Sequence, residues 1–166
     1  MARCINELQI MIYISHRGNI NGKNIEMENT PEYIDAAINS GYDVEIDIWV
    51  HGDRLFLGHD CGHSEIDIEF LNKRIYSLWI HCKNYKSVEF FRDKDFNWFW
   101  HDQDDMTLTK RGYVWVYPGK QPINKSIAVL PEIYNDDVSK CIGICSDYIE
   151  RYRNEGFQTR NNQISQ

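Results

Sequence analysis

The chain has 166 residues, of which 42% are hydrophobic and 13% aromatic, and its formal net charge at pH 7 is −7. This length and composition predict one globular domain with one sizeable core and exclude a largely disordered chain. The negative charge, with no run of Lys or Arg, argues against nucleic acid and anionic membrane surfaces as partners. A phosphate substrate is not excluded, because one or two local cations can bind a phosphate inside an acidic protein.

The sequence predicts a cytoplasmic protein with reduced cysteines. It contains no stretch of about 18 apolar residues, so no transmembrane helix is expected. Residues 1–15 lack the basic start and sustained apolar run of a signal peptide. The cysteines are odd in number and follow no disulfide framework: Cys4, Cys61, Cys82, Cys141 and Cys145. The oligomeric state is not determined by these observations.

The first predicted elements are a strand and a helix. An apolar run over Gln9–Ser15 predicts a buried strand, which Gly18 follows. Thr30 is a good N-cap, Pro31 suits the first helical position, and Gly41 is typical of a helix end. The helix between them has an apolar stripe made by Ile34, Ala37 and Ile38.

The later elements predict a shortened barrel. Further strands are expected near Asp43–Val50, Leu55–Gly58, Tyr76–Lys83, Asn97–His101, Tyr113–Tyr117, Ser126–Pro131 and Cys141–Asp147. Further helices are expected near Ser64–Lys73, Asn84–Arg92 and Asp147–Asn154. Early alternation of strand and helix indicates a parallel sheet, whereas a full eight-stranded barrel takes about 250 residues. We therefore predict an α/β fold, a compact, abbreviated TIM-type β/α barrel over residues 1–157 with short or missing later helices, followed by a polar, disordered tail over residues 158–166.

Two carboxylates form the first candidate site. Glu45 and Asp47 are two residues apart on a predicted strand, so their side chains share one face, while Ile46 and Ile48 share the other. Neighbouring carboxylates repel each other unless a cation joins them, and carboxylate oxygens suit Mg²⁺ or Ca²⁺. The same pattern also fits the solvated face of an antiparallel hairpin, and both interpretations remain open at this point.

A predicted hairpin brings a histidine to these carboxylates. Gly52–Asp53 is a strong signal for a two-residue turn. Such a turn places Ile46 opposite His59, whereas a three-residue loop places Glu45 opposite it. Directly opposed residues on paired strands lie about 5 Å apart, so either register brings His59 beside the carboxylates.

The end of the first strand carries a second histidine, His16. Two histidines near one phosphate can divide the proton transfers between them, and carboxylates nearby favour the protonated imidazole. The next residue, Arg17, offers a planar fork to phosphate oxygens, although its position fits a surface arginine equally well.

Four short motifs occur in order: His16–Gly18 (His-Arg-Gly), Glu28–Thr30 (Glu-Asn-Thr), Glu45–Asp47 (Glu-Ile-Asp) and His59–Asp60 (His-Asp). Their order and spacing resemble those of the glycerophosphodiester phosphodiesterases and the related phospholipase-D-type toxins, within the PLC-like phosphodiesterase superfamily. The resemblance is thin after this region, although Ser146–Asp147 is similar to the Thr-Asp that often ends the last strand of that family. It implies a β/α barrel fold.

The resemblance also implies roles for individual residues. It assigns His16 and His59 as the catalytic pair, Glu45 and Asp47 as ligands of a divalent cation, Glu28 as a residue of the ligand shell and Asn29 as a positioning residue.

One position departs from the family pattern. Where the family has a third acidic ligand in Glu-x-Lys, this chain has His81, with Lys83 at the lysine position. Histidine is a softer ligand that prefers Zn²⁺ to Ca²⁺. The cation is then held by His81 as well, or by two carboxylates and water, or it differs in kind or binds weakly. Lys83 fits a phosphate contact and a structural lysine about equally well.

Other candidates rank lower. The close spacing of His59, Cys61 and His63 is poorly suited to a tetrahedral zinc site. Residues expected near the barrel mouth are His101, Asp102, Glu132 and Asp147. Four aromatic residues are expected in the core rather than in a substrate platform, with the alternative that one of them walls the pocket: Trp98, Trp100, Trp115 and Tyr117.

We therefore predict a metal-assisted phosphodiester hydrolase that acts on small, glycerophosphodiester-like alcohol phosphodiesters. His16 is assigned as the base and His59 as the acid, with Arg17 and Lys83 at the phosphate. One alternative is a non-catalytic module that binds a phosphate ligand on the same barrel, for which the missing third carboxylate is the best support. Another is a metal-independent phosphoryl transferase.

Overall fold

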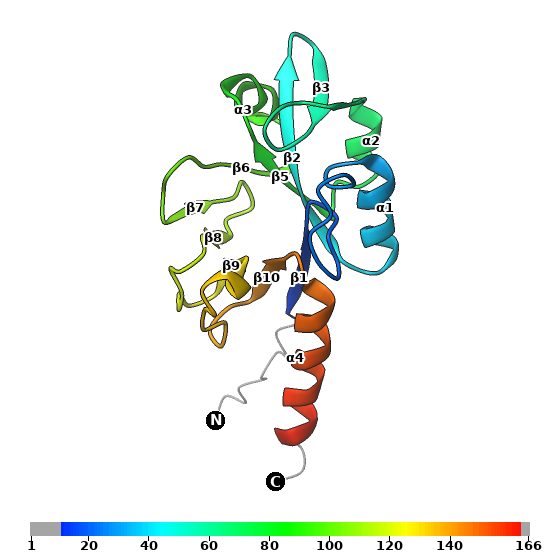
Figure 1. Cartoon of the computed structure of the whole chain (residues 1–166). Helices are drawn as coiled ribbons and strands as arrows, with labels where there is room; N and C mark the ends of the chain where they lie inside the picture. The colour runs from blue at the N-terminus through cyan, green and yellow to red at the C-terminus, as the bar shows by residue number, and fades with distance from the viewer. Residues whose placement is uncertain (1–10, 164–166) are drawn as a thin grey trace, which may run out of the picture.

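The protein is a mixed α/β structure built on one strongly curled, half-barrel sheet with few helices (Figure 1). The computed structural model describes residues 11–163, with side chains up to Gly156. Its strands are β1 (Ile12–His16), β2 (Asp43–His51), β3 (Arg54–Leu57), β4 (Ser64–Ile66), β5 (Leu78–Cys82), β6 (Asn97–Trp100), β7 (Met106–Leu108), β8 (Val114–Val116), β9 (Ser126–Val129) and β10 (Gly143–Ser146). The helices are α1 (Pro31–Asn39), α2 (Ile68–Asn72), α3 (Tyr85–Phe91), the short 3-10 helix η1 (Pro131–Ile133) and α4 (Ile149–Gln163).

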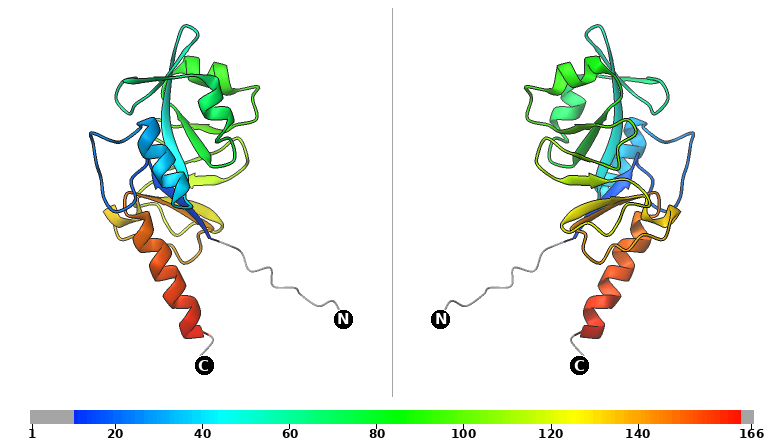
Figure 2. Two further views of the ribbon diagram at one scale, coloured as in Figure 1. Left: turned by 90° about the vertical axis from the view of Figure 1, so that its right-hand side faces the viewer. Right: turned by 90° about the vertical axis from the view of Figure 1, so that its left-hand side faces the viewer.

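The strands follow the curl in the order β6-β5-β2-β1-β10-β9-β8-β7. All neighbours along this path are parallel except β7, which runs antiparallel to β8. Strand β2 is long enough to pair on both edges at once, with β1 through Asp43–Glu45 and with β5 through Val44–Ile48. Its last residues extend beyond the curl and pair with β3, which carries β4, as the projecting hairpin in Figure 2 shows.

The side-chain alternation of β2 separates the hydrophobic core from the polar interior. Val44, Ile46 and Ile48 are fully buried and pack with Ile34 of α1, on the helix-covered side of the sheet. Glu45 and Asp47 therefore face the inside of the curl, as the period of two predicts. A second apolar cluster is built from the other strands of the sheet. It includes Ile14, Trp79, Phe99, Trp115 and Ile127.

Most predicted elements are present, and their differences have local causes. Helix α1 begins at Pro31 as predicted, but the Thr30 hydroxyl donates to the Met27 carbonyl instead of capping the helix. Residues Ser64–Ile66 form strand β4 rather than the start of a helix, because they pair with β3, and the helix begins only after Asp67, whose carboxylate accepts from the Phe70 amide. The sequence did not predict β7 or η1.

The later part of the chain has short connections, as expected. Between β6 and β10 the only described helix is the three-residue η1. Helix α4 continues to Gln163, past its predicted end at Asn154. The predictions for Gln9–Ile10 and residues 164–166 lie outside the described residues, and the disorder of the tail stays a prediction. None of the described helices is long and apolar enough to cross a membrane.

The hairpin register confirms the two-residue turn. His51 pairs with Arg54 and Ile48 pairs with Leu57. The Gly58 amide then donates to the Asp47 carbonyl at 3.2 Å, which continues the ladder and aims the next residue, His59, at the carboxylates.

Two glycines of this hairpin test its geometry. Gly58 has φ of +148°, and a Cβ added there would lie 2.0 Å from the Cys61 carbonyl oxygen, whereas Gly52 has φ of +60° and open space around it. We expect Gly58→Ala to lower the free energy of unfolding by about 3 kcal/mol or more, and Gly52→Ala by only about 1 kcal/mol. Urea unfolding of both variants measures the difference, and equal losses would contradict the described turn.

Candidate functional site

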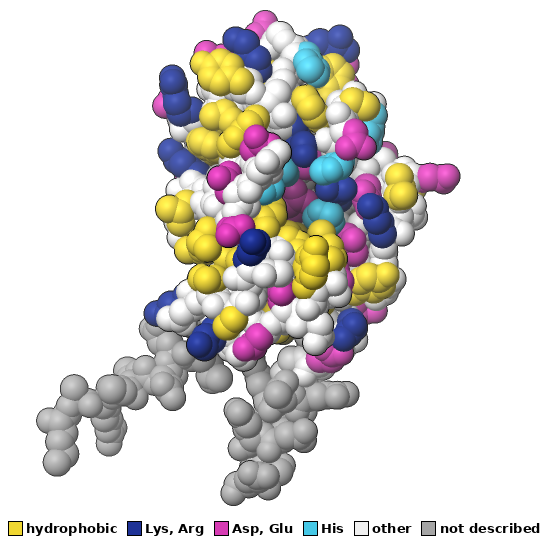
Figure 3. Space-filling model, turned by 60° about the vertical axis from the view of Figure 1, so that its left-hand side comes forward, with side chains coloured by type: hydrophobic (Ala, Val, Ile, Leu, Met, Phe, Trp, Pro, Cys, Tyr) yellow, Lys and Arg dark blue, Asp and Glu magenta, His cyan; other side chains and the backbone are white. Residues whose placement is uncertain are grey.

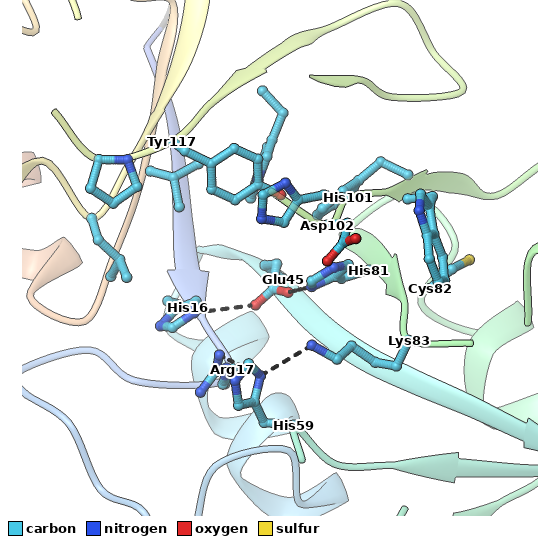
Figure 4. A pocket seen from close by; sticks show the side chains of 16 residues that line it. His16, Arg17, Glu45, His59, His81, Cys82, Lys83, His101, Asp102 and Tyr117 are labelled. Carbon is cyan, nitrogen blue, oxygen red and sulfur yellow. Dashed lines mark hydrogen bonds and ion pairs between the residues drawn. The ribbon is translucent and has the colours of Figure 1, made fainter. Parts of the chain in front are cut away.

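A cavity of about 510 Å³ opens at the carboxyl ends of the parallel strands. It is hollowed into the face shown in Figure 3, where histidine, acidic and basic side chains gather. His16 comes from the end of β1, Glu45 from β2, His81 and Lys83 from the end of β5, and His59 from the loop after β3. The curl of the sheet thus brings all the predicted catalytic residues to one cavity (Figure 4).

Asp47 lies at the centre of the polar network and is fully buried. Its Oδ2 is 3.0 Å from the Arg17 Nε, and its Oδ1 is 3.0 Å from the His81 Nδ1 and 3.5 Å from the Lys83 Nζ. Burial alone would raise the pKa of Asp47, but the hydrogen bond from His81 and the charge of Arg17 hold that pKa well below its usual range. Asp47 is therefore ionised.

Asn29 fixes the position of this carboxylate. Its side-chain amide donates to the Asp47 Oδ2 at 3.0 Å, and its carbonyl oxygen accepts from the Asp47 backbone amide at 3.0 Å. Both Asn29 and Arg17 have left-handed backbone conformations, with φ of 57° and 55°. The backbone N–H of Asn29 donates to the backbone carbonyl of Arg17. The positioning role predicted for Asn29 agrees with this geometry.

Arg17 lines the cavity, but protein groups engage its guanidinium. Besides Asp47, it contacts Glu28 through Nη1 at 3.2 Å and the His59 Nδ1 through Nη2 at 2.7 Å. A guanidinium can only donate, so the His59 Nδ1 accepts this hydrogen bond and the imidazole proton lies on Nε2. The Lys83 ammonium is 3.4 Å from the same nitrogen. Lys83 and Arg17 are thus the permanent cations of the cavity wall.

His16 is supported by residues that the sequence did not single out as its partners. Its Nδ1 bonds to the Asp147 Oδ1 at 2.7 Å, which leaves Nε2 facing Glu45 at 3.9 Å. Burial lowers the pKa of His16, yet the hydrogen bond that His16 donates to Asp147 and the charge of Glu45 outweigh burial and raise it overall. Asp147 was predicted only as a residue of the barrel mouth.

Asn19 links the supports of the two histidines and was missed. Its side-chain amide donates to the Asp147 Oδ1 at 2.8 Å and to the Glu28 Oε1 at 2.9 Å, and Asn19 is fully buried. A continuous chain of contacts therefore connects the two histidines. It runs from His16 through Asp147 to Asn19, and from there through Glu28 and Arg17 to His59. The sequence offered no signal for Asn19 beyond its place one residue after the His-Arg-Gly motif.

Glu45, Asp47 and His81 form the one group among the described residues that could hold a metal ion. One ligand atom from each lies within 4.8 Å of the others. Burial and the charge of Asp47 raise the pKa of Glu45, and its Oε2 has no hydrogen-bond partner among the described residues. Four carboxylates in the network face two permanent cations, so added positive charge would be favourable here, and a divalent cation stays a prediction; the carboxylates are Glu28, Glu45, Asp47 and Asp147.

An aromatic wall closes the other side of the cavity. His101 stacks on Tyr117 with 3.4 Å between ring centroids, and His81 stacks on Phe99 at 5.0 Å. Burial and the charge of His81 lower the pKa of His101 to about 4, so its imidazole is neutral near pH 7.

The core prediction for the aromatic residues is right for Trp115, which is 2% exposed, and wrong for Trp100, which is 43% exposed. Tyr117 lines the cavity with Trp100, because Trp100 is the last residue of β6 and Tyr117 directly follows β8.

Comparison with known proteins adds no assignment. No family model, curated protein or solved structure matches this chain. The site is therefore interpreted from its own residues.

Replacing the Asp147 carboxylate tests the electrostatics of His16. In Asp147→Asn the hydrogen-bond geometry is kept but the charge is lost, so we expect the pKa of His16 to fall, as measured by NMR titration. Because the folded-state pKa of His16 is raised above 6.5, the stabilisation from this pair is complete below pH 6.5 and is lost as the pH rises through the folded-state pKa. The variant should lose less stability than the wild type over that pH range. An unchanged His16 pKa would contradict the pairing.

Proposed function

We propose that the protein is a phosphodiester hydrolase of the glycerophosphodiester phosphodiesterase type, on an abbreviated β/α barrel. The observation that carries the proposal is the convergence of His16 and His59 on one cavity that Glu45, Arg17 and Lys83 also line, with Asp47 buried in contact with both cations. Binding a phosphate alone needs no pair of histidines, so this arrangement favours turnover over a non-catalytic module. We place the protein in the cytoplasm, with a small alcohol phosphodiester as substrate.

The cations of the cavity would receive the phosphate. Lys83 lines the cavity with its ammonium near His59, and it would contact a phosphate oxygen directly. Arg17, held from behind by Asp47 and Glu28, would contribute its charge without moving. Fixed charges of this kind stabilise a transition state without a cost of reorganisation.

The two histidines would transfer the protons. His16 donates from Nδ1 to Asp147, so its Nε2 would accept a proton from the attacking water or substrate hydroxyl, while the Nε2 proton of His59 would go to the leaving alcohol. This direction keeps the sequence-based assignment of His16 as base and His59 as acid. The reason is the Asp147 carboxylate, which holds the Nδ1 proton of His16 and leaves Nε2 toward the cavity.

A divalent cation, Mg²⁺ or Ca²⁺, would be held by Glu45 and Asp47, with His81 as a further ligand. When bound, such a cation supplies positive charge to the phosphate oxygens.

One observation favours the metal-independent alternative. Arg17 and Lys83 already lie within 3.5 Å of Asp47, so part of the charge that a metal would balance is balanced by the protein.

Removing either histidine tests the catalytic assignment. We expect His16→Ala and His59→Ala each to lower the turnover of a glycerophosphodiester by about 10²–10⁴-fold, because each loses a proton-transfer group. His51→Ala is the matched control, since His51 is exposed at the hairpin tip and does not line the cavity. Near-normal turnover in either site variant, with a folded protein by circular dichroism, would refute the pair.

Metal dependence separates the proposal from its alternative. We expect activity to be lost in EDTA and restored by Mg²⁺ or Ca²⁺, and His81→Glu to tighten binding of either ion by calorimetry, because an oxygen anion replaces an imidazole. Full activity in EDTA, with no metal binding in either protein, would favour the metal-independent mechanism instead.

A further inference from the structure

Glu132 supports the site from behind. It was expected near the barrel mouth, but in the described part of the chain it does not line the cavity and lies in the short helix η1, next to Asp147. Its Oε1 accepts from the Ser146 hydroxyl at 2.8 Å and from the Asp147 backbone N–H at 3.3 Å. Ser146 is fully buried, and its hydroxyl oxygen accepts in turn from the Tyr148 backbone N–H at 2.9 Å. One carboxylate therefore holds the turn that carries the partner of His16.

The backbone of Asp147 needs this acceptor because it lies just beyond the sheet. Strand β10 pairs with β1 up to Ser146 and with β9 up to Cys145. The Asp147 carbonyl accepts from the Gly22 N–H at 2.7 Å, and Glu132 accepts from the Asp147 N–H. Backbone donors away from water almost always have an acceptor in folded proteins, so this contact fixes where Asp147 lies.

A strained turn brings Glu132 to this place. Leu130 has φ of 44° and ψ of 50°, a left-handed conformation that is unfavourable for a residue with a Cβ. Its N–H donates to the Cys145 carbonyl at 2.7 Å, so the turn starts in contact with β10, and Pro131 then begins η1. Strained residues persist only where their surroundings hold them, and they cluster at functional sites. The turn directs the chain over the end of β10, where Glu132 meets Asp147.

The contact of Asp147 with His16 decides which imidazole nitrogen carries the proton. The His16 Nδ1 is 2.7 Å from the Asp147 Oδ1, whereas Nε2 is 3.9 Å from the Glu45 Oε2, too far for a hydrogen bond. An ionised carboxylate can only accept, so Nδ1 donates and Nε2 is left for the reaction. A neutral histidine in water prefers the opposite tautomer, with its proton on Nε2. A shift of Asp147 would therefore move this proton and disable the base.

We propose that Glu132 is a positioning residue for His16: by accepting hydrogen bonds from Ser146 and the Asp147 backbone, it keeps the proton of His16 on Nδ1. The role requires an oxygen acceptor at this position and not a negative charge. This inference rests on the proposed function for the role of His16 as base, but the tautomer of His16 is measured without turnover.

The first test measures the tautomer by proton–nitrogen correlation NMR of the full chain, at a pH where the imidazole is neutral. The signals of His16 are assigned by their loss in His16→Ala. In Glu132→Ala we expect the ratio of the Nδ1–H to the Nε2–H tautomer to fall by about tenfold or more, since a hydrogen bond to a charged group contributes that much. Glu132→Gln should keep the ratio within about threefold of the wild type, because the amide oxygen accepts the same two hydrogen bonds. Ser146→Ala should lie between these variants.

Asp136→Ala is the matched control. Asp136 lies in the same loop, is partly buried like Glu132, and its Oδ2 accepts from the Gly119 backbone N–H at 2.8 Å. The variant loses a carboxylate–amide hydrogen bond of the same kind away from β10, so we expect lower stability with an unchanged tautomer of His16. An equal change of tautomer in Asp136→Ala would indicate a general loosening of the loop and would overturn the inference.

Steady-state turnover of a glycerophosphodiester gives the second readout. Glu132→Ala should lower kcat by about ten- to a hundredfold with an unchanged KM, because a misplaced base slows the reaction while Glu132 itself does not line the cavity. Glu132→Gln should restore kcat in parallel with the tautomer.

The outcomes separate this inference from the proposed function. An unchanged tautomer in Glu132→Ala, or a Glu132→Gln protein as altered as Glu132→Ala, would overturn the positioning role while leaving the hydrolase intact. A shifted tautomer in a protein whose wild type turns over no diester would support the positioning role and refute the hydrolase. If Glu132→Ala does not fold, Ser146→Ala decides, and a wild-type tautomer in that variant would overturn the inference.

Discussion

The site depends on one fully buried carboxylate, Asp47. A buried charge is costly unless cations and hydrogen bonds compensate it, and here both oxygens are compensated. The compensation comes from three separate segments of the chain, since Asn29 precedes α1, Arg17 follows β1 and His81 lies on β5. The electrostatic need of a single residue thus joins Arg17, Asn29, His81 and Lys83 around one carboxylate.

The curled sheet makes this compensation possible. Parallel strands end at the same edge, so side chains from β1, β2 and β5 meet there without long loops. Helices α1 to α3 cover the outside of this half, where the apolar residues of β2 need burial. The other half replaces most helices with short connections and closes the interior with the aromatic stack of Phe99 and Trp115. The protein therefore keeps a complete cavity in a short chain.

The polar network also explains why the two histidines differ. His16 donates from Nδ1 to Asp147 and faces Glu45 with Nε2, whereas the Nδ1 of His59 accepts from Arg17 and also lies 3.3 Å from the Asp47 Oδ2. The two imidazoles therefore carry their protons on different nitrogens. Two chemically identical side chains in one cavity are in this way prepared for different roles.

The sequence by itself determined the features that depend on local periodicity and turns. The alternation of β2 placed Glu45 and Asp47 on one face, and Gly52–Asp53 set the register that delivers His59, because strand geometry and turn chemistry act over a few residues.

The tertiary structure alone decided which distant residues complete the site. Asn19 and Asp147 are far apart in the chain, and so are His101 and Tyr117; nothing in their neighbours predicts that they meet. The sequence also placed Ser64–Ile66 in a helix and Trp100 in the core, where pairing with β3 and exposure at the cavity mouth prevailed. These contacts are set by how far the sheet curls, which is a sum over many strand pairings and cannot be read from any one segment.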